Sequence, residues 1–337
     1  MLSQFKPAWW LNSHHLQTLF PTLFRQRPKL NRRRERITTP DDDFLDIDWY
    51  SENVSANKPL VIVMHGLAGS SNSAYVLGMQ AQIATLGWRS VALNFRGCSG
   101  EHNLTARAYH SGETEDIEFI YQTLQQREPE TDIYVIGFSL SGNVLLKWLG
   151  EQGNKTQVKA AVAISVPMVL SECANRLDQG FSTVYRLYLM RPLKQFVLKK
   201  YDYLKSVNRE SEAEKIKQLG DLKQVKSFWQ YDAQVIAKLH QFESAEDYYQ
   251  QSSSRQFIAH IKTPTLILHA VDDPFMTPNV LPEDDEIPDY VTLEKTNGGG
   301  HVGFISGNNP FKPEYWLENR VSQFLQQYES SFEKAEK

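Results

Sequence analysis

The chain has 337 residues, of which 41% are hydrophobic and 23% charged, and its formal net charge is −4. These values are typical of a folded globular protein, exclude a disordered chain and give no general attraction to nucleic acid. The two cysteines, Cys98 and Cys173, lack a C-x-x-C spacing, so we expect neither a disulfide framework nor a thiolate zinc site. A reducing compartment, the cytoplasm, is the expected location.

The N-terminal extension, up to about residue 30, is rich in aromatic residues but lacks the basic start and apolar run of a signal peptide. No stretch of the chain approaches the roughly 20 apolar residues of a membrane span. The basic run from Arg25 to Arg36 could dock on anionic lipid. We favour a packed segment followed by a solvated hairpin, because the run is interrupted and overlaps a predicted strand that turns at Thr39 to Asp42. Peripheral membrane contact is therefore not favoured.

Strands and helices then alternate along the chain. Apolar, β-branched runs predict strands at 59–66, 88–97, 133–136, 158–167, 263–273 and 290–296, and helical spacing predicts helices at 73–86, 113–126 and 314–328. Continuous apolar strands separated by helices predict a mostly parallel sheet with helices on both faces, and the hairpin completes eight strands.

Residues 168 to 257 interrupt this alternation with helical spacing and no strand pattern. An insertion between the sixth and seventh strands would lie over the C-terminal edge of the sheet, where open parallel sheets build their sites. We therefore expect a helical cap over that edge. The alternative is a second folded lobe without a role in substrate binding.

The stretch "DIYVIGFSLSGNVLLKWL" carries a strand directly into a helix through small residues. So abrupt a turn at Ser139 crowds the positions two before and two or three after it. Those positions are Gly137, Ser141 and Gly142. The pattern resembles the nucleophile elbow of α/β-hydrolases, G-x-S-x-G, with Ser141 in place of the second glycine. Ser141 could itself be the nucleophile, but centring the turn there fits the crowding less well, so we favour Ser139.

A serine hydroxyl needs a base to take its proton and a third group to orient that base. In α/β-hydrolases the order along the chain is serine, acid, histidine. The stretch "TLILHAVDDPFMTP" contains an apolar strand that ends in Asp272 and Asp273, and His301 lies in the glycine-rich loop "NGGGHVGF". We favour Asp273 as the acid because the D-P-x-x-x-P run that begins there resembles the usual acid turn, and Asp272 remains an alternative.

An acyl-transfer intermediate also needs two donors aimed at its oxyanion. The backbone N–H of Leu140, which follows the serine, is one candidate. The loop "HGLAGSS" after the strand at 59–66 resembles the H-G-x loop of lipases and esterases, so we assign the second donor to the N–H of Leu67.

Motifs spread over nearly the whole chain resemble the YheT-like esterase branch of the α/β-hydrolases: "PAWWLNSHHLQTLFP", "HGLAGSSNSAYV", "NFRGCSG", "YHSGETEDI", "GFSLSGNVLLKWLGE" and "GGHVGF". The resemblance implies a single α/β-hydrolase domain over residues 1–337. It also implies Ser139 as nucleophile, Asp273 as acid and His301 as base, with activity on carboxylic esters. Relatives in this branch act on phospholipids, on short or medium acyl esters, or in acyl transfer to alcohols.

We therefore expect a serine esterase that needs no cofactor or metal and takes a small-molecule or lipid-like ester. The alternatives are an acyltransferase that passes the acyl group to an alcohol, and a binding module with a vestigial triad. Apolar cap side chains predict an acyl pocket beneath the cap, namely Phe181, Tyr185, Leu189, Phe196, Phe228 and Trp229. The alternative is that these side chains only pack the cap internally.

Overall fold

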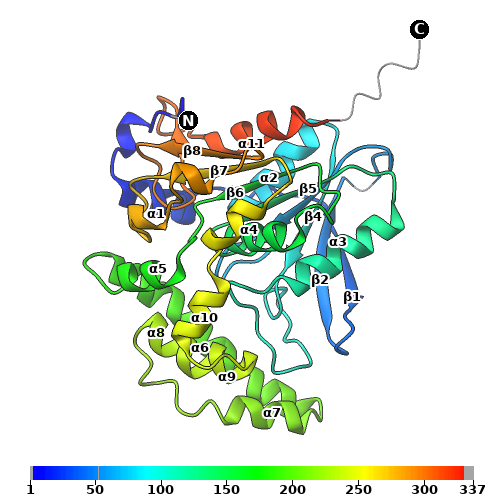
Figure 1. Cartoon of the computed structure of the whole chain (residues 1–337), viewed down its shortest axis with the longest axis vertical. Helices are drawn as coiled ribbons and strands as arrows, with labels where there is room; N and C mark the ends of the chain where they lie inside the picture. Colours follow the sequence, from blue (N-terminus) through cyan, green and yellow to red (C-terminus); the bar gives the residue numbers. More distant parts are fainter. Residues whose placement is uncertain (1–2, 52, 330–337) are drawn as a thin grey trace.

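The computed structural model describes residues 3–51 and 53–329 and is built around one eight-stranded sheet (Figure 1). The strand order is β1-β2-β4-β3-β5-β6-β7-β8. The strands are β1 Arg33–Thr38, β2 Phe44–Tyr50, β3 Leu60–Met64, β4 Arg89–Asn94, β5 Ile133–Phe138, β6 Ala160–Ile164, β7 Thr265–Ala270 and β8 Val291–Thr296. Strands β3 to β8 are parallel, and β1 and β2 form an antiparallel edge. The expected mostly parallel sheet is confirmed.

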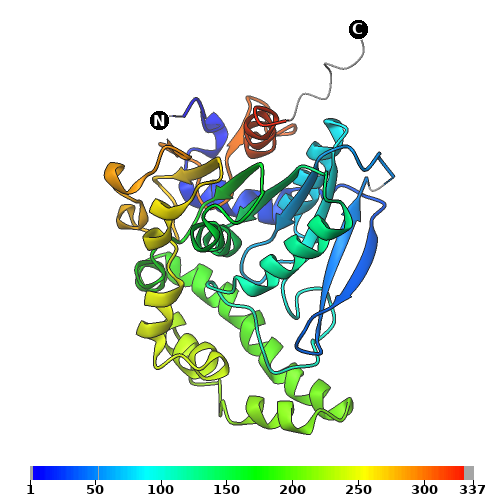
Figure 2. The same ribbon diagram turned by 45° about the vertical axis from the view of Figure 1, so that its right-hand side comes forward.

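Helices cover both faces of this sheet because successive side chains of each buried strand point to opposite faces. Val61 and Val63 of β3 pack into one apolar cluster, whereas Ile62 packs into the other. The first cluster includes α2 and α11, and the second includes α3 and α4 (Figure 2). The bounds of these helices are α2 Ala74–Thr85, α3 Glu115–Arg127, α4 Leu140–Gln152 and α11 Trp316–Gln326.

The hairpin of β1 and β2 accounts for part of the basic run. The Arg34 guanidinium lies 2.9 Å from the Asp48 carboxylate, and that of Arg36 lies 2.8 Å from Asp46. Each aspartate of β2 lies directly opposite its arginine of β1 in the strand register. The two cations are therefore paired within the hairpin. This pairing and the mostly exposed side chains of β1 agree with the expected solvated hairpin.

The insertion between β6 and β7 is helical and gathers below the sheet in Figures 1 and 2, coloured green to yellow. Its helices are α5 Leu170–Leu177, α6 Ser182–Ser206, α7 Glu210–Lys217, α8 Phe228–Tyr231, η2 Asp232–Ile236, α9 Ala237–His240, α10 Ala245–Ser252 and η3 Arg255–His260. All of them except η3 contribute to an apolar cluster distinct from the two clusters that flank the sheet, whereas Ile258 of η3 packs in a sheet cluster. The expected helical cap insertion of the fold is confirmed.

The N-terminal segment packs against a late part of the chain. It forms η1 Trp9–Leu11 and α1 His14–Phe24. The Gln17 amide of α1 donates to the carbonyls of Leu11 and Ile305, and its oxygen accepts from the Ile305 N–H at 2.7 Å. Since Gln17 is buried, these bonds fix α1 beside the loop that follows β8.

The last helix begins two residues later than expected. The sequence predicts a helix from residue 314, but Glu314–Tyr315 forms the short strand β10, which pairs with β9 at Ile305–Ser306. Long-range pairing overrides local helical spacing at these two residues. Within residues 3–51 and 53–329, we find no helix with the length and hydropathy of a membrane span.

Candidate active site

Ser139 occupies the sharp turn between β5 and α4 with φ 55° and ψ −117°, a strained conformation for a residue with a side chain. A Cβ at Gly137 would lie 2.5 Å from the Ser141 carbonyl oxygen, and one at Gly142 would lie 2.7 Å from a methyl of Val166. Neither position has room for a side chain. The crowding predicted around the turn is thus real at both glycines, and it holds Ser139 at the start of α4.

Ser141 has a different environment from Ser139. Its side chain is fully buried, and its Oγ accepts from the Phe138 N–H at 2.8 Å while lying 2.8 Å from the Met64 carbonyl. The hydroxyl therefore closes the turn by bonding the backbone of two neighbouring strands. Ser139 is only half-buried, which leaves its hydroxyl the accessible one.

The structure brings Ser139, His301 and Asp273 together. His301 Nε2 lies 2.9 Å from Ser139 Oγ, and its Nδ1 lies 2.7 Å from Asp273 Oδ2. The Asp273 carboxylate is buried and its other oxygen accepts from the Phe275 N–H. The Phe275 ring stacks on the imidazole with centroids 4.0 Å apart. The imidazole thus has a carboxylate on one nitrogen and a hydroxyl on the other, which fixes its orientation.

Asp272, the alternative acid, faces another group. Its Oδ1 accepts from the backbone N–H of Gly300 at 3.0 Å. Burial raises the pKa of this carboxyl above its usual range. Asp272 therefore supports the loop that carries His301, and Asp273 is the aspartate that reaches the imidazole.

The loop after β3 lies against the elbow, since a Cβ at Gly66 would be 3.2 Å from the Ser139 Cβ. Two tyrosine hydroxyls hold its backbone: Tyr75 accepts from the Gly66 N–H at 2.8 Å, and Tyr109 accepts from the Ala68 N–H at 2.9 Å. The intervening N–H of Leu67 has no recorded acceptor among the described residues. It is therefore available to an oxyanion.

His65 and Leu140 complete this region. Burial lowers the pKa of His65 to about 4, so its imidazole is neutral at pH 7, with Nδ1 2.8 Å from the Gly66 carbonyl and Nε2 accepting from the Phe95 N–H. Leu140 is the first residue of α4, where a helix has no internal acceptor for its N–H. No acceptor for that N–H is recorded in the described part of the chain.

Several residues that support the His301 loop were not identified from the sequence. The Thr18 hydroxyl of α1 accepts from the His301 N–H at 2.9 Å, and the Ser165 hydroxyl after β6 accepts from the Val302 N–H at 3.1 Å. A Cβ at Gly300 would lie 2.5 Å from the His14 carbonyl, so α1 presses directly on the loop. The only sequence signal was the branch-specific motif at residues 7–21, which marks α1 without indicating what it touches.

Most of the cap side chains proposed for an acyl pocket belong to the cap's own cluster or pack against it. Phe228 and Tyr185 are buried in the cap's own cluster, Leu189, Phe196 and Trp229 pack against it, and Phe181 is exposed. Leu67 packs both on a sheet cluster and on the cap cluster, and Phe275 also packs on the cap. Leu67 and Phe275 therefore link the candidate site to the cap, and Tyr185 of the cap contacts Phe275.

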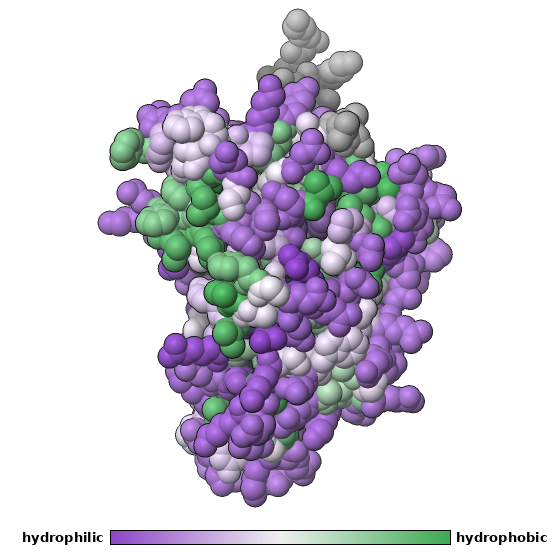
Figure 3. Space-filling model, turned by 90° about the vertical axis from the view of Figure 1, so that its left-hand side faces the viewer, coloured by the Kyte–Doolittle hydropathy of each residue, from purple (hydrophilic) through white to green (hydrophobic). Residues whose placement is uncertain are grey.

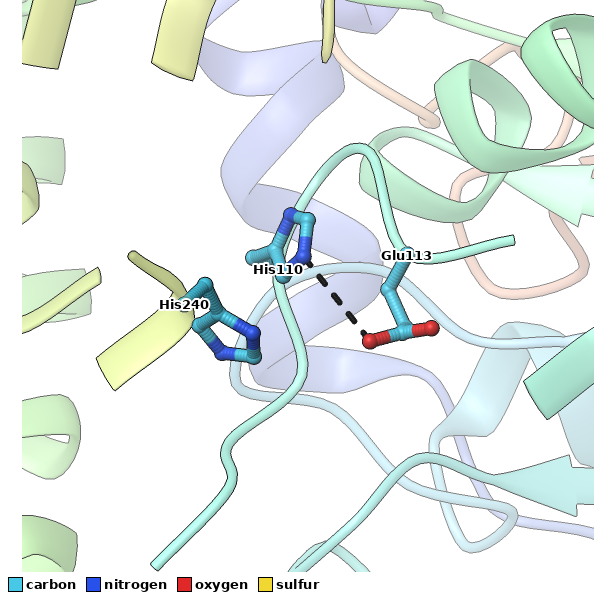
Figure 4. Close-up of side chains that lie close together, drawn as sticks. All are labelled: His110, Glu113 and His240. Carbon is cyan, nitrogen blue, oxygen red and sulfur yellow. Dashed lines mark ion pairs between the residues drawn. The ribbon is translucent and has the colours of Figure 1, made fainter. Parts of the chain in front are cut away.

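A second group of titratable side chains consists of His110, Glu113 and His240, which place ligand atoms within 4.8 Å of one another (Figure 4). Arg107 already donates to Glu113 Oε2 at 2.7 Å. The Gly112 N–H donates to His110 Nδ1, which leaves the proton of that ring on Nε2, the atom that faces Glu113. Both features disfavour the binding of a metal cation. The cluster is better described as two neutral histidines beside the ion pair of Arg107 and Glu113.

The topology defines the class of protein. An open parallel sheet with a serine elbow after β5, a buried aspartate after β7 and a histidine after β8 is the arrangement of α/β-hydrolases. The family model described as alpha/beta hydrolase fold matches residues 59–308, and the chain belongs to this family.

Individual relatives cover nearly the whole chain. It is 38% identical over 330 residues to "Putative esterase YheT" of Escherichia coli, covering 97% of this chain and 94% of that protein. It is 29% identical to "Phospholipase ABHD3" of Mus musculus, covering 95% and 77%. Among solved structures, the Pyrococcus furiosus esterase Pf2001 is similar with a TM-score of 0.55 at 18% identity, covering 91% of this chain and 99% of that one, which shows the shared fold.

Proposed function

We propose that this protein is a serine esterase that hydrolyses carboxylic esters through an acyl-enzyme. The observation that carries the proposal is the continuous hydrogen-bonded chain from Ser139 Oγ through the His301 imidazole to the Asp273 carboxylate. The strained elbow supports it, because backbone strain persists where the surrounding structure holds a reactive group in place. Relatives named as esterase and phospholipase agree with this class of reaction.

In the proposed reaction, His301 Nε2 takes the proton of Ser139 Oγ as the oxygen attacks the ester carbonyl. Asp273 keeps the imidazole in the tautomer with Nδ1 protonated and stabilises the imidazolium that forms. The N–H groups of Leu67 and Leu140 donate to the oxyanion. His301 then protonates the leaving alcohol and activates the water that hydrolyses the acyl-enzyme. This reaction needs neither a metal nor a cofactor.

Labelling with a fluorophosphonate probe tests the assignment, since the probe reacts only with an activated serine. Ser139→Ala should abolish labelling, and His301→Ala should nearly do so. Ser141→Ala should keep its labelling per folded molecule, although loss of its buried hydrogen bonds should cost about 2 kcal/mol of stability. Circular dichroism gives the folded fraction of each variant. Unchanged labelling of Ser139→Ala would refute the proposal.

The substrate is proposed as a short to medium acyl ester or a lipid-like ester. A series of p-nitrophenyl esters from acetate to decanoate measures the acyl preference, because each buried methylene contributes about 0.8 kcal/mol. A steady fall of kcat/KM from acetate onward would rule out an apolar acyl site beneath the cap. Product analysis with added ethanol distinguishes hydrolysis from acyl transfer to an alcohol.

We also infer that residues 1–337 form one α/β-hydrolase domain, with a cap at about 168–257 and an N-terminal extension at about 1–30. Residues 1–2, 52 and 330–337 of this division lie outside the described part of the chain. The proposed location is the cytoplasm, since Cys98 and Cys173 are unpaired thiols. Burial raises the pKa of Cys98 to about 12, which makes this thiol unreactive at neutral pH.

A further inference from the structure

The first half of α6 exposes an unusual set of large apolar side chains. Leu187 is 63% and Tyr188 is 68% exposed, and Phe181 and Val184 are also exposed. Positions 181, 184 and 188 share one helical face, with 187 beside it. We name these four residues the α6 apolar face. Figure 3 shows a band of apolar surface across the side of the molecule on which α1 and the start of the cap lie.

Helix α1 extends this face. His15 of α1 contacts the Phe181 ring with centroids 4.4 Å apart, and its Nδ1 lies 2.9 Å from the Tyr185 hydroxyl. Leu16, the next residue of α1, is about half exposed. Two helices that are distant in sequence thus join their apolar side chains on one surface. A contiguous exposed apolar patch on a folded protein marks a site of contact with another molecule or a membrane.

This surface adjoins the candidate active site. The Tyr185 ring, on the neighbouring side of α6, contacts Phe275 with centroids 4.9 Å apart. Phe275 in turn stacks on His301. Only two aromatic rings therefore separate the histidine from the helix that carries the exposed face, and a molecule bound there would lie close to the candidate active site.

Cations predominate beside the α6 apolar face, and the Arg186 guanidinium within it is paired with Asp178. Arg191 and Lys199 are exposed on the continuation of the same helix, and among the described residues no carboxylate partner is recorded for either. The first acidic residue of α6 is Asp202. An anionic phospholipid layer has an apolar interior and negatively charged headgroups. The exposed apolar residues of α6 suit that interior, and the unpaired cations further along the helix suit the headgroups.

A second copy of this chain fits the surface less well. A twofold dimer would place the same patch on both sides of the interface and would bring like cations toward each other. We propose that the α6 apolar face and the adjoining part of α1 dock on an anionic phospholipid surface. The basic run Arg25 to Arg36 is a different surface, and two of its arginines are paired within the hairpin.

Vesicle sedimentation of the full chain carrying Ser139→Ala tests docking without turnover. The protein should sediment with vesicles of phosphatidylcholine and phosphatidylglycerol, several-fold less with phosphatidylcholine alone, and less as salt is raised. Leu187→Gln with Tyr188→Gln should lower partitioning about tenfold or more. Val207→Gln is the matched control, because Val207 is exposed at the end of the same helix, about 30 Å away along its axis.

Three results would overturn the proposal: no sedimentation with the mixed vesicles, equal sedimentation of the double variant, or equal loss in the Val207→Gln control. A concentration-dependent dimer that the double variant abolishes would instead assign the surface to a second copy. Hydrolysis of p-nitrophenyl acetate by otherwise unchanged protein should be the same with and without the Leu187 and Tyr188 substitutions. That measurement separates failure of docking from failure of the proposed esterase activity.

Discussion

The elbow that holds Ser139 and the loop that holds His301 are built in opposite ways. The elbow is stabilised by residues within five positions of one another: Gly137, Ser141 and Gly142 make the turn possible, and Ser141 also bonds the next strand. Its conformation is fixed by the order of small residues along one stretch of chain. The order of small residues that permits the turn is local, and so a motif in the sequence is sufficient to find it, although Met64 and Val166 also contact the elbow.

The His301 loop has no comparable local support. Its backbone N–H groups donate to Thr18, Ser165 and Asp272, which come from three distant segments. Its glycines admit the backbone of α1 at close range. Ser139 Oγ and His301 Nε2 lie 2.9 Å apart. The serine is positioned mainly by neighbours in the sequence, and the histidine by packing against distant segments. Substitutions in the two regions should therefore have different effects on stability and on activity.

The largest difference is expected between the two adjacent aspartates. Asp273→Asn should lower kcat about 10⁴-fold, because an amide at Nδ1 favours the wrong tautomer of the imidazole. Asp272→Asn should cost less than about tenfold, since its amide oxygen can still accept from the Gly300 N–H. Steady-state kinetics on one soluble ester measures both variants. Reversal of this order would show that the wrong aspartate has been assigned to His301.

Substitution of a glycine at the elbow should mainly reduce the stability of the fold. Gly137→Ala should lower the free energy of unfolding by about 3 kcal/mol, because its Cβ would lie within 2.5 Å of the Ser141 carbonyl oxygen. Gly180→Ala is the control: that glycine has open space around it but φ +52°, and it should lose only about 1 kcal/mol. Urea unfolding measures both. Equal losses would mean that crowding at the elbow is not the reason for its glycine.

Substitution of a residue that supports the His301 loop should mainly displace the imidazole and so reduce activity. Thr18→Val removes the acceptor of the His301 N–H at nearly constant volume, so kcat should fall about tenfold with KM unchanged. Thr22→Val, one turn further along α1 and exposed, should behave as the unsubstituted protein does. A kcat for Thr18→Val within twofold of the unsubstituted value would show that α1 does not position the histidine. A rise in KM alone would point to substrate binding instead.

The sequence by itself determined the parts of this protein that depend on short-range patterns. Apolar runs indicated the sheet strands, because a strand buried on both faces is apolar throughout. The insertion of helices after β6 was visible as an interruption of that alternation. Ser139, Asp273 and His301 were chosen from local motifs and chain order, and the structure brings these three side chains together.

Only the tertiary structure decided the contacts between segments that are far apart in the chain. No spacing in the sequence indicates that Thr18 bonds the His301 backbone, or that Tyr75 and Tyr109 hold the loop around Leu67. The acyl-pocket expectation for the cap stays a prediction for the same reason: helical spacing shows that a side chain is apolar, but not whether it faces the cap's interior or the substrate. Which apolar faces remain uncovered, as on α6, follows from how the helices pack, because burial is a property of the whole fold.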